Sequence, residues 1–211
     1  MVEQPRLPGS PRRQASRQAA IALIGSVAIT LAMFLIPSPE HTWWLLAPFR
    51  WLHIYVHEFG HGVAALLVGG RFEKFEMWTY SGVATITGVG TGASGNFAAA
   101  FVSAGGLCGP AVVGGLFLAT GRRPGLARIA LAAFGAFMAV SLVLWTRTPF
   151  GWGFGAAVAA LSLLVAIGAR PAHAQAVLVF LGVQLALSVY TGGGYLFTQY
   201  VTIQNGQYTP S

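Results

Sequence analysis

Three histidines and a glutamate fall within nine residues of an otherwise apolar stretch. His57 and His61 are four residues apart and Glu58 follows the first of them, so the pattern is H-E-x-x-H. On a helix, positions i and i+4 share a face, so both imidazoles can reach one metal ion. Zinc with three protein ligands keeps a position for water and lowers its pKa to roughly 7. The spacing therefore predicts zinc ligands at His57 and His61, with Glu58 as general base.

The surroundings of the motif strengthen this interpretation. From Trp51 to Val68 the only strongly polar side chains are His53, His57, Glu58 and His61. Ionisable groups inside a membrane span are costly and usually mark a functional site. The alternative is a buried polar cluster, without metal, that is hydrogen-bonded to neighbouring helices.

His53 lies one further helical turn before the motif. At 1.5 Å rise per residue it is roughly 12 Å along the axis from His61, so the two cannot share one ion. A second-shell or substrate-side role is one interpretation. A histidine packed at a helix interface is the other.

The composition identifies the kind of protein that must position these side chains. Of 211 residues, 55% are apolar and 8% are charged, whereas a soluble domain has roughly 25% charged residues. The mean hydropathy is +0.66. These values indicate an integral membrane protein and exclude a soluble enzyme, a coiled coil and a disordered chain. The net charge of +7 is spread between apolar runs, which suits lipid headgroups and lacks the basic face of a nucleic-acid-binding protein.

Apolar runs predict an all-α polytopic membrane protein with about five to six transmembrane helices. The runs cover 19–36, 51–68, 97–119, 129–145, 152–169 and 172–190. We expect residues 1–18 to form a disordered basic tail and 19–211 a single membrane-embedded domain. The first run reads as an uncleaved signal anchor with a cytoplasmic N-terminus, in preference to a cleaved or twin-arginine signal peptide.

The basic residues do not agree with a simple series of crossings. From a cytoplasmic N-terminus, the linker with Arg122, Arg123 and Arg128 would lie outside, against the positive-inside rule. This conflict favours a re-entrant or non-crossing course for one run, around 97–119 or 152–169.

Residues 71–90 differ from the apolar runs. Charged residues alternate with Phe72, Phe75 and Met77, and Ser81-Gly82 separates two segments rich in β-branched and aromatic residues. This period-two pattern around a turn predicts a small β-hairpin insert at about 71–90. A plain amphipathic connector is the alternative.

Small residues are frequent in the later runs. Gly105-x-x-x-Gly109 and Gly151-x-x-x-Gly155 suit close packing of helices, although a generally glycine-rich composition produces such spacings too. The single cysteine, Cys108, lies in the same apolar run and is expected to be a buried small hydrophobe.

Together, these segments resemble a known family. The run Trp-Leu-His-x-x-Val-His-Glu-Phe-Gly-His is followed by Gly-Gly-Arg-Phe, the hairpin, and Gly-Gly-Leu-Cys-Gly-Pro ending at Gly109-Pro110. This order is similar to that of the site-2 protease-like intramembrane zinc metalloproteases, in particular their compact bacterial branch without a PDZ domain. The resemblance covers residues 43–119 most clearly. It implies zinc ligands at His57 and His61, a general base at Glu58, and a hairpin that presents substrate as an extended strand.

One feature departs from that family. Its third zinc ligand is an aspartate on a later helix, and this sequence contains no aspartate. The expected position is near 192–196 or just beyond Ser211, where Thr-Pro-Ser suits the start of a helix. Either the aspartate lies beyond Ser211 or the protein has lost this ligand. Replacement by neutral amides, which are poor zinc ligands, is disfavoured at Gln184, Gln199, Gln204 and Asn205.

The sequence therefore predicts a hydrolase for intramembrane proteolysis, which cleaves transmembrane protein substrates with zinc-activated water. The resemblance also implies a bacterial inner membrane. A catalytically inactive, metalloprotease-derived subunit that packs in a larger membrane complex remains the alternative. A transporter or channel is weaker, because the intramembrane charge is confined to one helix and no repeat symmetry accompanies it.

Overall fold

The computed structural model describes residues 17, 20–21, 23–25, 27–29, 31–32, 43–89, 92–192, 200–202 and 208–210. The predicted tail at 1–18 therefore lies almost wholly outside the described residues, as does much of the first apolar run. The division into a tail and one domain stays a prediction.

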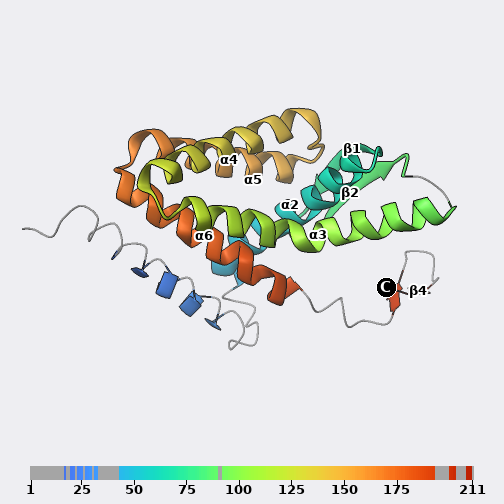
Figure 1. The fold of residues 1–211 in the computed structure, drawn as a ribbon, viewed down its shortest axis with the longest axis horizontal. Helices are drawn as coiled ribbons and strands as arrows, with labels where there is room; N and C mark the ends of the chain where they lie inside the picture. Colours follow the sequence, from blue (N-terminus) through green and yellow to red (C-terminus); the bar gives the residue numbers. More distant parts are fainter. Residues whose placement is uncertain are drawn as a thin grey trace, which may run out of the picture.

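Five helices make up most of the described chain (Figure 1). The motif-bearing helix is α2 (Trp43–Leu67); it is followed by α3 (Gly92–Thr120), α4 (Pro124–Leu144), α5 (Pro149–Gly168) and α6 (Pro171–Gly192). Proline is the first residue of the last three helices. The N–H groups of a first helical turn have no acceptor within the helix, so proline costs no hydrogen bond there. Among the described residues, α3 to α6 each contain a stretch long and apolar enough to cross a membrane. The prediction of a helical membrane protein with a small hairpin is confirmed.

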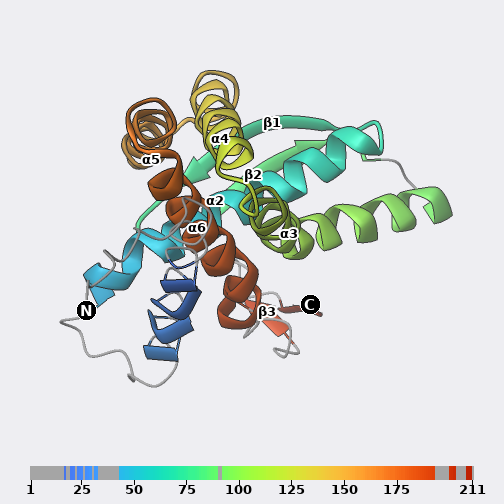
Figure 2. The ribbon, with the colours of Figure 1, turned by 60° about the vertical axis from the view of Figure 1, so that its left-hand side comes forward.

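The helices pack as a series in which sequence neighbours are not always spatial neighbours. Helix α2 packs on α3, α3 on α6, α6 on α4, and α4 on α5. Figure 2 shows α4 and α5 together on one side of α6, with α3 on the other and α2 crossing behind it. Helices α3 and α4 meet each other far less than each meets α6, so α6 joins the two halves.

Glycines allow α2 and α3 to approach until their backbones touch. A Cβ added at Gly105 would lie 2.6 Å from the Gly60 carbonyl oxygen, and one at Gly109 would lie 3.1 Å from the Gly60 Cα. Small residues permit such close approach between membrane helices. The Gly105-x-x-x-Gly109 spacing is therefore part of a real helix contact.

The predicted hairpin is confirmed as an antiparallel pair, β1 (Arg71–Met77) with β2 (Gly82–Thr87). Its register shifts between Phe72 and Lys74, which makes Glu73 the extra residue of a bulge. The bulge explains why the buried positions of β1 are Phe72, Phe75 and Met77, since the first interval is three residues instead of two.

The outer edge of β1 is joined to the connection between α4 and α5. The Phe75 N–H donates to the Trp145 carbonyl at 2.7 Å, and the Arg147 N–H donates to the Phe75 carbonyl at 2.9 Å. The Thr148 hydroxyl accepts from the Met77 N–H at 3.0 Å and donates to the Met77 carbonyl at 2.8 Å. Residues 145–148 thus complete the hydrogen bonding of this strand edge, as a third strand would.

Two sequence expectations need correction. Cys108 is exposed, because its position on α3 faces away from the protein core; in a membrane helix an apolar side chain can be directed at lipid instead. Near the C-terminus, β3 (Tyr200–Thr202) pairs antiparallel with β4 (Tyr208–Pro210). Thr209 and Pro210 therefore belong to a strand in the described part of the chain.

The glycine contact gives a first testable prediction. Gly60→Ala should lower the free energy of unfolding by roughly 1–3 kcal/mol, because its new methyl group meets the Gly105 carbonyl and the helices must separate. Thermal unfolding in detergent measures the change. Gly115→Ala is the matched control, since a Cβ at Gly115 has nothing within 4 Å. Equal melting of the two variants would contradict the close backbone contact.

Candidate functional site

The two histidines of the motif converge on one point. Their Nε2 atoms are 3.2 Å apart, and their ring centroids are 4.8 Å apart. Two ligands about 2.05 Å from a tetrahedral zinc ion lie about 3.3 Å from each other. This pair of nitrogens therefore has the separation that two ligands of one zinc ion need.

A backbone group on α3 orients the second histidine. Nδ1 of His61 lies 2.8 Å from the carbonyl oxygen of Val102. Because a carbonyl only accepts, Nδ1 must carry the proton, and Nε2 of the neutral ring then keeps its lone pair for a metal. Gly106, one turn later, lies directly against the same imidazole, where a Cβ would collide with it. Helix α3 thus fixes both the tautomer and the ring position.

Glu58 is directed to the hairpin. Its Oε2 accepts a hydrogen bond of 2.9 Å from the backbone N–H of Ala84 in β2. Gly82 is next to the same side chain, since a Cβ there would lie 3.1 Å from Glu58 Cγ and 2.6 Å from Ile54 Cγ2. The predicted base is therefore held between its own helix and the edge of β2.

His53 contacts a different helix. Its Nδ1 lies 2.8 Å from the Ser188 hydroxyl of α6, and its ring centroid is 5.5 Å from that of His57. The bond joins α2 to α6 beside the predicted site. Its position agrees with the packed-interface interpretation, and a second-shell role stays a prediction.

The described residues bring together two metal-binding side chains of the usual types. Within them, no group of three or more His, Cys, Asp or Glu residues is placed to hold an ion. Gln184 is buried in α6, while Gln199, Gln204 and Asn205 lie outside the described residues. Among the described residues, the histidine pair therefore supplies two of the ligands that a zinc site needs.

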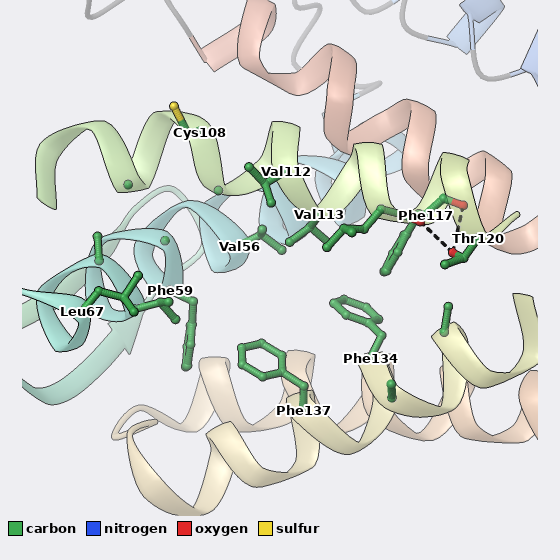
Figure 3. Close-up of a pocket in the computed structure, with 18 of the residues that line it drawn as sticks. Val56, Phe59, Leu67, Cys108, Val112, Val113, Phe117, Thr120, Phe134 and Phe137 are labelled. Carbon is green, nitrogen blue, oxygen red and sulfur yellow. Dashed lines mark hydrogen bonds between the residues drawn. The ribbon is translucent and has the colours of Figure 1, made fainter. Parts of the chain in front are cut away.

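A large apolar groove lies on another side of α2. It has a volume of about 580 Å³ and is lined by side chains of α2, α3 and α4, including Phe59, Val113 and Phe134. Figure 3 shows Phe134 and Phe137 projecting from α4 toward α3. The hydroxyl of Thr120, at one end, donates within its own helix to the Leu116 carbonyl. Neither motif histidine nor Glu58 lines this groove, so it is separate from the candidate metal site.

A family model described as Peptidase M50B-like matches residues 24–206. The chain belongs to this family. No curated protein and no solved structure matches it. Membership confirms the resemblance to site-2 protease-like enzymes, and together with the four apolar helices it identifies an integral membrane protein of the metallopeptidase type.

Sequence reasoning missed three backbone elements of this family member's site. They are the Val102 carbonyl, the Ala84 N–H and the flat surface at Gly106. Only Gly106 left a trace in the sequence, as one of two adjacent glycines at 105–106. The other two are groups that every residue type carries, so no sequence signal could have found them.

The attachment of the hairpin gives a second prediction. Thr148→Val should leave the buried Met77 N–H and carbonyl without their partner, at a cost of roughly 1–3 kcal/mol. Hydrogen exchange should then be faster at Met77 and in the rest of β1. Thr120→Val is the control, because that hydroxyl bonds only within its own helix. Unchanged exchange in the hairpin would show that Thr148 does not hold it.

Proposed function

We propose that this protein is a membrane-embedded zinc endopeptidase that cleaves transmembrane protein substrates. The observation that carries the proposal is the 3.2 Å separation of the His57 and His61 Nε2 atoms, with Glu58 next to them in the H-E-x-x-H order. Membership of the Peptidase M50B-like family supports it.

His57 and His61 would hold the ion through Nε2, with a third ligand from outside the described residues. Zinc in such a site acts as a Lewis acid that lowers the pKa of water and polarises a carbonyl. Glu58 takes a proton from the attacking water and passes it to the leaving amine. His61 keeps its orientation through the bond to Val102, so its Nε2 lone pair would be available to the ion.

Substrate would reach the site as an extended strand. A peptide bond inside a transmembrane helix is closed off by helical hydrogen bonds, so a segment of the substrate must unwind before cleavage. In the hairpin at 71–87, the edge of β2 that faces away from β1 can receive such a segment. We infer a bacterial inner membrane with a cytoplasmic N-terminus as the location, in line with the basic residues before the first apolar run.

A second candidate is an inactive, metalloprotease-derived subunit of a larger membrane complex. It is favoured by the count of only two zinc-type ligands at the motif among the described residues. Apolar side chains exposed on several helices, such as Leu116, Val143 and Leu164, would then contact partner subunits as well as lipid.

Elemental analysis separates these candidates. The full-length protein should carry about one zinc per chain, and a His57→Ala, His61→Ala double variant should carry none. His173→Ala is the control, because that histidine is exposed at the start of α6. A folded wild-type protein without zinc would overturn the peptidase proposal and favour the inactive subunit.

The role of Glu58 is tested by Glu58→Gln. This variant should keep its zinc and its fold and lose cleavage by about 10²–10⁴-fold, because the amide cannot accept the proton. Cleavage of single-pass membrane proteins in proteoliposomes provides the rate. Glu73→Gln, on the exposed side of β1, should cleave like the parent. Equal rates for Glu58→Gln and the parent would exclude the general-base role.

A further inference from the structure

The hydrogen bond between Ala84 and Glu58 lies on the outer edge of β2. Ala84 pairs with Phe75 across the hairpin, and the Phe75 N–H and carbonyl both bond away from β2, to Trp145 and Arg147. Phe75 and Ala84 are therefore a non-hydrogen-bonded pair of the antiparallel ladder. The Ala84 N–H and carbonyl consequently point away from β1, on the edge where the Glu58 carboxylate accepts from the N–H.

This edge is where another strand can join the hairpin. The opposite edge, on β1, is already bonded along its length, at Phe72 by the Trp145 indole, at Phe75 by residues 145–147 and at Met77 by Thr148. In the described part of the chain, β2 pairs only with β1. An extended peptide that adds to this sheet must therefore pair with the β2 edge.

A strand on that edge would lie beside the two histidines. Successive residues of a helix turn by about 100°, so the His57–His61 stripe of α2 falls between two others. On one side is the Ile54–Glu58 stripe, which meets Gly82 of β2; on the other is the Gly60–Ala64 stripe, which meets Gly105 of α3. A peptide next to β2 on this side would consequently run along the histidine stripe.

We propose that Glu58 is a latch on the β2 edge, so that peptide pairing at Ala84 and the Glu58 hydrogen bond exclude each other. One N–H cannot fully satisfy two acceptors, and an added strand needs the Ala84 N–H for its own carbonyl. Pairing therefore releases the Glu58 carboxylate at the moment when a peptide lies beside His57 and His61. The bond that positions Glu58 at rest is the one that a correctly placed substrate replaces.

This inference rests on the proposed function at one point, the role of the freed Glu58 carboxylate as general base. The competition itself needs no metal and no cleavage. It can therefore be measured on metal-free, full-length protein in detergent.

The probe is a fluorescein-labelled short peptide of alternating Thr and Val, and fluorescence anisotropy measures its binding. Glu58→Ala should bind it roughly ten- to a hundredfold more tightly than the parent, because no charge-assisted hydrogen bond has to be displaced. Glu73→Ala, in the other strand, should bind like the parent. Ala84→Pro removes the N–H and should abolish binding.

Hydrogen exchange at Ala84 gives a second readout if the proline variant does not fold. The Ala84 amide should exchange slowly in the parent, faster in Glu58→Ala, and slowly again in Glu58→Ala with saturating peptide. Equal peptide affinity in the parent and Glu58→Ala, or no binding to either, would overturn the latch. If the protein binds zinc and cleaves substrate but the parent and Glu58→Ala bind the peptide equally, the proposed function stands and the latch is excluded. If Glu58 and the peptide compete but the protein binds no zinc, the latch stands and the proposed function is excluded.

Discussion

The backbone contact of α2 with α3 determines the geometry of the histidine pair. Gly60 and Gly105 let the helices meet without intervening side chains, and this brings the Val102 carbonyl within 2.8 Å of His61 Nδ1. A larger residue at either glycine would move that carbonyl away. The direction of the Nε2 lone pair, on which the proposed metal binding relies, therefore depends on a contact that contains no polar side chain. In lipid, where apolar side chains gain little from meeting each other, close backbone packing provides this association.

The hairpin connects the site to the second half of the helices. One of its edges is bonded to residues 145–148, and its other edge meets Glu58. The segment 145–148 also contacts α2, because the buried Tyr55 hydroxyl bonds to Ser141 of α4 and lies 3.5 Å from the Thr146 hydroxyl. Trp51 adds a bond from its indole to the Thr79 carbonyl in the hairpin turn at 2.8 Å. The position of β2 relative to α2 is thus defined by polar groups at several points, which suits an element that meets the proposed general base.

Much of this arrangement was predictable because it follows from short, local patterns of residue types in the sequence. Apolar runs predicted α3 to α6, alternation predicted the hairpin, and the four-residue spacing of His57 and His61 placed both on one helical face. The bulge at Glu73 was not predictable, since it depends on how β1 meets its neighbours. The exposure of Cys108 was missed because an apolar run does not say which of its sides meets protein and which meets lipid. The partners of His61 and Glu58 are backbone groups distant in sequence, and only the packing of the helices selects them.

The contacts between elements form a closed circuit. It passes from α2 to α3, to α6, to α4, through residues 145–148 to β1, and back to α2. In a circuit of this kind no member can move outward alone, because each is restrained from both directions. Three of its members line the apolar groove, so the gap between α3 and α4 is bounded by α6 on one side and by the bonds of Phe75 and Met77 on the other. The small hairpin therefore connects the two ends of this circuit of helices, and its bonds to residues 145–148 help to set the width of the groove.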